Sequence, residues 1–165
     1  MSDAAAPDTR AVQTNGSAST PVQVARRFLD RLAANDLDGA IDLVADDIVY
    51  TNVSLPSIKG RDNVRRVLGG LDRPTVTFEV YFHSVSAEGG TVLTERTDVI
   101  QLGRVRLQFW VWGRFDVADG RITLWRDSFD WADMTRATLR GLAGAVIPAL
   151  QPKAPTDPTT EAPGR

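Results

Sequence analysis

The sequence has no cysteine and only one histidine, His83, among its 165 residues. The absence of cysteine excludes disulfide bonds, zinc–thiolate sites and a cysteine nucleophile. A single histidine makes a multi-histidine metal site impossible, and a Ser-His-Asp triad would have to use His83. Any chemistry must therefore rest mainly on carboxylates, arginine, tyrosine and amides.

The sequence also lacks a large excess of positive or negative charge, and it has no long hydrophobic run. The 19 lysine and arginine residues nearly balance the 21 aspartate and glutamate residues, for a formal net charge of −2. Nucleic-acid-binding domains usually carry a basic face, so we expect no nucleic-acid partner. No apolar run reaches the roughly 20 residues of a membrane helix, and the N-terminal residues lack the apolar core of a signal peptide. We therefore expect a cytoplasmic protein with no membrane span.

The two ends of the chain are poor in residues that could form a core. Residues 1–19 are rich in Ala, Ser, Thr and Asp without apolar periodicity, and residues 151–165 contain four prolines. Neither end can bury enough apolar area to offset the entropy of ordering. The sequence therefore predicts disordered tails at 1–19 and 151–165 around a single domain at 20–150, as the length also suggests.

Within that domain the apolar pattern changes from helical to strand-like near Thr75. Helical spacing predicts helices at 20–32, 37–44 and 61–68, with a strand at 47–53. From Thr75 apolar and polar residues alternate, and turns at 89–90, 103 and 119–120 separate long strands, the last reaching Trp131. Asp133 is expected to cap a final helix that ends near Ile147. This order predicts an α+β fold with helices on one face of a curved sheet.

Five polar residues lie where the alternation would point them inward. Arg96 and Asp98 share a face of one strand, Asp127 shares a face with apolar residues of the last strand, and Tyr50 and Asn52 form another same-face pair. Burying two aspartates unpaired is costly, whereas an arginine between them could hold both. Two carboxylates beside one arginine can share a proton. One acid and one base would then be available for concerted catalysis.

Purely structural roles explain the same pattern. An Arg-x-Asp pair on a strand is more often a solvated face or a structural ion pair, and Tyr50 would by default be a core or rim tyrosine. His83 falls on the polar side of its strand, so we interpret it as a surface histidine and not a catalyst. Trp110 and Trp112 point away from the core face. Exposed paired tryptophans are unusual on a monomer, so they predict a homodimer through the sheet.

From residue 22 to 150 the chain closely resembles the limonene-1,2-epoxide hydrolase family. The matching stretches are residues 49–53, 93–98, 106–110 and 119–127. The likeness is nearest to actinobacterial members that act on bulky, lipid-like epoxides. It implies a cone-shaped, curved mixed β-sheet with N-terminal helices packed on its concave face, as in nuclear transport factor 2-like and SnoaL-like proteins.

The resemblance also implies a reaction and a set of roles. Family members open epoxides by direct attack of water, without a covalent intermediate, metal or cofactor. Carried over by position, Asp127 is the general base, Asp98 is the general acid, and Arg96 bridges them. Tyr50 and Asn52 hold the water beside Asp127. The candidate pocket walls are Trp125, Phe109 and Phe78, together with Leu and Val residues of the last helix.

Two positions depart from the family pattern. Ser128 follows Trp-Arg-Asp where relatives often have an aromatic residue, and Thr94 stands where they often have Asn. Because Thr94 shares a face with Arg96, it bears on pocket polarity. The leading hypothesis is hydrolysis of a terpenoid, sterol or lipid-like epoxide to a vicinal diol. A ketosteroid-isomerase-like isomerase, a polyketide cyclase or a non-catalytic module that binds an apolar ligand remain alternatives on the same fold.

Overall fold

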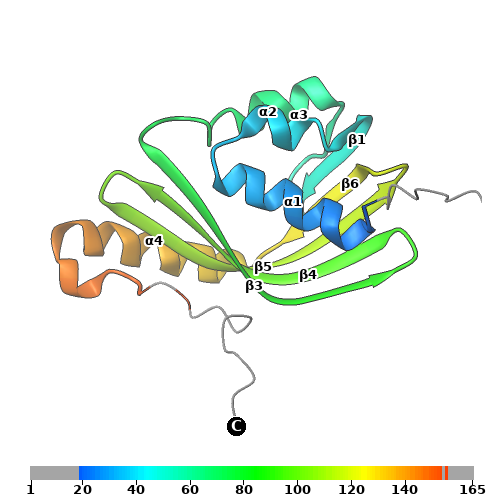
Figure 1. Cartoon of the computed structure of the whole chain (residues 1–165). Helices are drawn as coiled ribbons and strands as arrows, with labels where there is room; N and C mark the ends of the chain where they lie inside the picture. Colours follow the sequence, from blue (N-terminus) through cyan, green and yellow to red (C-terminus); the bar gives the residue numbers. More distant parts are fainter. Residues whose placement is uncertain (1–18, 154, 156–165) are drawn as a thin grey trace, which may run out of the picture.

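The computed structural model describes residues 19–153 and 155, and three helices precede its long strands (Figure 1). The elements are α1 (Pro21–Ala33), α2 (Leu37–Ile41), β1 (Val44–Asn52), β2 (Ile58–Lys59), α3 (Arg61–Leu68), β3 (Val76–Glu88), β4 (Thr91–Leu102), β5 (Val105–Ala118), β6 (Arg121–Ser128), α4 (Trp131–Val146) and the 3₁₀ turn η1 (Pro148–Leu150). The predicted tails lie almost entirely outside the described residues, so the boundaries at 20 and 150 stay a prediction.

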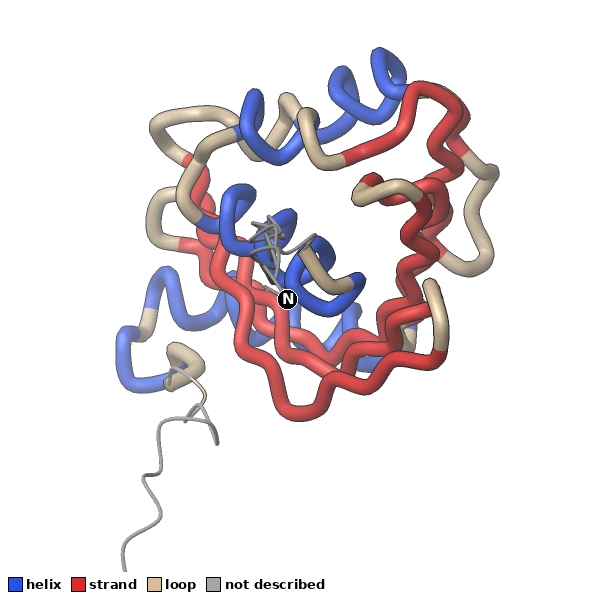
Figure 2. Tube along the Cα trace, turned by 45° about the vertical axis from the view of Figure 1, so that its right-hand side comes forward, coloured by secondary structure: helices blue, strands red, loops and turns tan. Residues whose placement is uncertain are grey.

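The six strands form one open, mixed sheet in the order β2-β1-β6-β5-β4-β3. Strands β3 to β6 make an antiparallel meander, and β1 pairs with β6 in parallel. Figure 2 shows the strands curving around helical segments that lie in the hollow of the sheet. The expected α+β fold, with N-terminal helices on the concave face, is confirmed.

Helix α1 forms the centre of the core on that concave face. Thr20 caps it in a reciprocal capping box with Gln23, and Pro21 occupies its first turn, where a missing N–H costs nothing. Its buried stripe includes Phe28, whose ring packs edge-on against Trp125 with ring centroids 5.0 Å apart. The apolar periodicity of this segment therefore fixes which helix face meets the sheet.

Several predicted boundaries differ in the structure, and the strand expected at 47–53 is β1, which already begins at Val44. The second helix ends at Ile41, because Val44 already pairs with Ile122 in the sheet. Strand β6 ends at Ser128 instead of Trp131, and the cap of α4 is Asp130, whose carboxylate accepts from Ala132 N at 2.8 Å. Because Asp130 caps the helix three residues before Asp133, α4 begins at Trp131 and Asp133 lies in the first turn of α4.

Helix α4 packs against β5 and forms a second, smaller apolar cluster. Met134 and Ala137 of α4 meet Phe109 and Val111 of β5 there. Within the described part of the chain, no helix is long and apolar enough to cross a membrane.

Candidate active site

Strand register aligns two predicted site residues, Asn52 and Asp127, with Gly113 and Thr94 in a row across the concave face. Asn52 on β1 lies opposite Asp127 on β6, Asp127 lies opposite Gly113 on β5, and Gly113 lies opposite Thr94 on β4. Tyr50 occupies the same face two residues before Asn52. Three consecutive strands, β4, β5 and β6, and the distant strand β1 therefore contribute to one small region.

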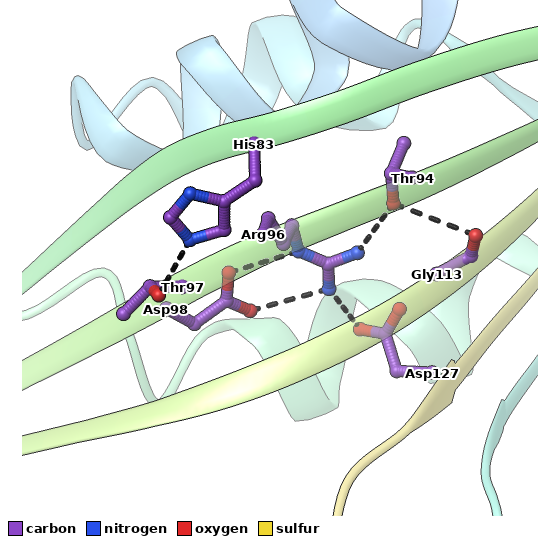
Figure 3. Close-up of polar contacts among 7 residues, drawn as sticks. All are labelled: His83, Thr94, Arg96, Thr97, Asp98, Gly113 and Asp127. Carbon is purple, nitrogen blue, oxygen red and sulfur yellow. Dashed lines mark hydrogen bonds and ion pairs between the residues drawn. The ribbon is translucent and has the colours of Figure 1, made fainter. Parts of the chain in front are cut away.

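Arg96 joins the two aspartates, as Figure 3 shows. Its Nε donates to Asp98 Oδ1 at 2.8 Å and its Nη2 to Asp98 Oδ2 at 3.2 Å. The same Nη2 donates to Asp127 Oδ2 at 2.6 Å. Arg96 is 0 % exposed and each aspartate 5 %. One guanidinium thus serves two carboxylates in a site almost closed to solvent.

The charge balance of this cluster favours one bound proton. Two ionised carboxylates beside one guanidinium would leave a net negative charge in a buried site, which is costly. Burial raises the pKa of Asp98 to about 6, and the negative charge of Asp127 adds to that effect while Arg96 opposes it. Burial also opposes the charge of Arg96, but Asp127 and Asp98 outweigh it and raise its pKa. Arg96 therefore stays charged while Asp98 can carry the proton.

Tyr50 and Asn52 form a second polar group beside the two aspartates. Asn52 Nδ2 donates to the Tyr50 hydroxyl at 2.8 Å, and the Tyr50 ring stacks on Trp125 with centroids 4.1 Å apart. Burial, reinforced by the charge of Asp127, raises the pKa of Tyr50 to about 12. Its hydroxyl keeps its proton at neutral pH and, having accepted from Asn52, can still donate.

A cavity of about 200 Å³ connects these groups. Tyr50, Asn52, Asp98 and Asp127 supply its polar lining, and most of the remaining lining is apolar. The three aromatic residues expected as walls, Trp125, Phe109 and Phe78, all line it. From α4 the lining residue is Met134; the leucines and the valine of that helix are largely exposed, so the Leu and Val side chains expected there do not reach the cavity.

His83 lies apart from this cluster. Its ring stacks on Trp110 with centroids 4.4 Å apart, and its Nε2 is 2.8 Å from Thr97 Oγ1. Thr97 alternates with Arg96 and Asp98 along β4, so it faces the other side of the sheet. His83 is half-buried beneath its neighbours there, less exposed than a surface histidine usually is, and does not line the cavity.

Comparison with known proteins identifies the family. Residues 19–140 match the family model described as the limonene-1,2-epoxide hydrolase catalytic domain. This chain belongs to the limonene-1,2-epoxide hydrolase family. It is 46% identical over 124 residues to the epoxide hydrolase EphG of Mycobacterium tuberculosis, covering 75% of this chain and 83% of that protein. Family membership identifies it as an epoxide hydrolase.

Solved structures agree on the fold. An M. tuberculosis LEH-like epoxide hydrolase is similar with a TM-score of 0.77 and 42% identity, over 81% of this chain and 95% of that one. A putative polyketide cyclase from Xanthomonas campestris is similar with a TM-score of 0.63 and 15% identity, over 71% and 96%. At that identity the second likeness shows the shared fold alone.

Gly113, at the centre of this candidate site, was not singled out from the sequence. Gly113 lies in the interior of β5, directly between Thr94 and Asp127. Glycine weakens a strand interior and often marks a close approach of other groups. Its place between Val111 and Phe115, where the alternation calls for an inward-facing apolar side chain, was the available signal.

Proposed function

We propose that this hydrolase adds water to an apolar epoxide in one step and releases a vicinal diol. The observation that carries the proposal is the buried Arg96 guanidinium, which holds Asp98 and Asp127 together at the polar end of an apolar cavity. In this proposal Asp127 is the general base and Asp98 the general acid.

The base side is built around one free carboxylate oxygen. Asp127 Oδ2 is occupied by Arg96, whereas Oδ1 is buried and has no hydrogen-bond partner within residues 19–153 and 155. Tyr50 and Asn52 line the cavity with it. We propose that these three side chains orient a water molecule, and that Oδ1 takes its proton as the water oxygen attacks a ring carbon.

The acid side uses the proton that burial retains on Asp98, whose pKa is raised to about 6. As the ring carbon–oxygen bond breaks, Asp98 protonates the epoxide oxygen, so neither hydroxide nor free alkoxide has to form. Each positioned proton transfer contributes about 10²–10⁴-fold. The reaction balances with water alone, so we propose that it needs no cofactor. The described residues contain no cluster of three or more His, Cys, Asp or Glu suited to a metal.

The cavity also limits the substrate. A volume of about 200 Å³ lies below the range of roughly 300–1,000 Å³ usual for drug-sized ligands. We propose that a compact terpenoid epoxide, or the epoxide-bearing part of a sterol or lipid, enters it while the rest of a larger substrate extends outward.

Turnover of terpene, sterol and fatty-acid epoxides by the wild type and by Asp127→Ala tests the proposal. We expect diol formation by the wild type and a loss of about 10²–10⁴-fold in the variant. Glu79→Gln is the matched control, because Glu79 is a carboxylate paired with arginine outside the cavity. Equal rates for wild type and Asp127→Ala, or no diol from any epoxide, would exclude the mechanism.

We also propose a homodimer that forms through the convex face of the sheet. Trp110 and Trp112, which are 41 % and 57 % exposed, lie on that face. Sedimentation at micromolar concentration should give a dimer, and Trp112→Lys should give a monomer that retains the cavity. A wild-type monomer would contradict this arrangement. The expected cytoplasmic location stays a prediction.

A further inference from the structure

The guanidinium of Arg96 reaches Asp127 by crossing over β5 at Gly113. A Cβ built on Gly113 would overlap Arg96 Nη1 and Thr94 Oγ1 and would lie 3.1 Å from Asp127 Oδ1. Arg96 comes from β4 and Asp127 from β6, and β5 runs between them. The missing side chain at position 113 is therefore the space through which the cation contacts both carboxylates.

Thr94 fixes the edge of the guanidinium that faces away from the carboxylates. Arg96 Nη1 donates to Thr94 Oγ1 at 3.1 Å, and Thr94 Oγ1 donates to the Gly113 carbonyl at 3.4 Å (Figure 3). Because the hydroxyl proton points at that carbonyl, an oxygen lone pair is left for Nη1. Thr94 is only 3 % exposed, so water is a poor substitute for its hydroxyl.

We infer that Thr94 and Gly113 are positioning residues for the acid–base pair: Gly113 makes room for the guanidinium, and Thr94 sets its rotation. This inference rests on the roles proposed for Asp98 and Asp127. Neither positioning residue lines the cavity, so both act through Arg96 and not on the substrate.

Loss of the hydrogen bond from Arg96 to Thr94 would change the pKa of Asp98. Burial raises its pKa and the charge of Arg96 lowers it. If the guanidinium can rotate away, the lowering contribution weakens while burial remains. The pKa of Asp98 then rises further, and Asp127 loses the contact that orients its carboxylate.

Three threonine variants test this inference. Thr94→Val removes the hydroxyl at almost constant volume, and Thr94→Ser restores it. Thr97→Val is the matched control, because Thr97 is also a buried threonine of β4 that makes a side-chain hydrogen bond, but on the opposite face. The measurements are kcat and KM for the epoxide that the wild type turns over fastest, the pH profile of kcat/KM, and carboxyl NMR titration of Asp98, which needs no substrate.

We expect Thr94→Val to lose about tenfold to a hundredfold in kcat, the effect of losing a hydrogen bond to a charged group. Its KM should change little, and the pKa of Asp98 should rise in both the kinetic and the NMR titrations. Thr94→Ser should recover most of the rate, and Thr97→Val should match the wild type. Gly113→Ala should be at least as impaired as Thr94→Val.

An unchanged pH profile and an unchanged Asp98 titration in Thr94→Val would overturn the inference. This holds even if the melting temperature of the variant fell, because loss of a threonine with a purely structural role would lower the melting temperature and leave the titration unchanged. Since Gly113→Ala can fail to fold, the threonine series decides the outcome. If Asp127→Ala keeps full activity, the proposed function fails instead. The NMR titration still reports whether Thr94 and Gly113 position Arg96.

Discussion

Two arginine–carboxylate clusters lie on opposite faces of the same sheet. On the convex face, Arg106 Nη1 and Nη2 donate to the two carboxylate oxygens of Glu79, each at 2.9 Å. The side chains of this pair are 13 % and 29 % exposed. On the concave face, Arg96 is completely buried and shares its donors between two aspartates. The same residue types are therefore present in two very different environments.

The two environments shift carboxylate pKa values in opposite directions. Hydrogen bonds from Arg106 lower the pKa of Glu79 and outweigh its partial burial. At Asp98 burial is the largest effect and raises the pKa to about 6 against the attraction of Arg96. One cation for one half-exposed carboxylate makes a structural ion pair. One cation for two buried carboxylates leaves a proton to be shared, which acid–base chemistry requires.

The largest difference is expected when each arginine is removed. Arg96→Met leaves two buried aspartates without a cation and should lower the free energy of unfolding by about 3–5 kcal/mol. Arg106→Met, its control, breaks a partly solvated pair and should cost about 0–1 kcal/mol. Urea denaturation at neutral pH measures both. Similar losses in the two variants would show that burial does not distinguish the clusters.

The second-largest effect is expected in the pH dependence of the free energy of unfolding, to which Asp98 contributes. The pKa of Asp98 is raised from 3.8 to about 6 on folding, so its stabilising contribution is complete below about pH 4 and is lost as the pH rises through 6. The two values imply a decrease of about 3 kcal/mol over that interval. Asp98→Asn should lack this decrease when denaturation is compared at each pH. A wild type with the same pH dependence as the variant would contradict the raised pKa.

The rate of hydrolysis should depend on the protonation state of Asp98. Because Asp98 must be protonated to act as the acid, kcat/KM should fall about tenfold for each pH unit above about 6. The pH profile of kcat/KM measures this limb. Glu79→Gln should show the limb at the same pH, and a limb that moved in that variant would mean that the convex cluster takes part.

The smallest effect is expected at Glu79, with the opposite sign. Because its pKa is lowered on folding, its stabilisation is present above the unfolded value of about 4.5 and is lost as the pH falls through the folded value. Thermal melting of Glu79→Gln and wild type should therefore converge in acid and separate at neutral pH. A difference in melting temperature that grew as the pH fell would contradict the lowered pKa of Glu79.

Much of this arrangement could be predicted from the sequence. The apolar stripe of α1 and the alternation of apolar and polar residues in the long strands can be read directly from the sequence. The alternation placed Arg96, Asp98 and Asp127 on inward faces. The boundaries at Ile41, Val44, Ser128 and Asp130 were missed, because pairing of Val44 with Ile122 and capping of α4 depend on other segments of the chain. Gly113 was missed because its meaning depends on which side chain crosses it.

The sequence by itself determined the fold class, the family and the residue types available for chemistry, because periodicity, composition and motifs are properties of the chain. Only the tertiary structure decided which arginine is completely buried with two carboxylates and which is slightly exposed and paired with one. Each cluster contains an ion pair between residues far apart in the sequence, Arg106 with Glu79 and Arg96 with Asp127, which only strand pairing brings together. Strand register and the helix covering one face set their solvation, and solvation determines the direction in which each carboxylate pKa moves.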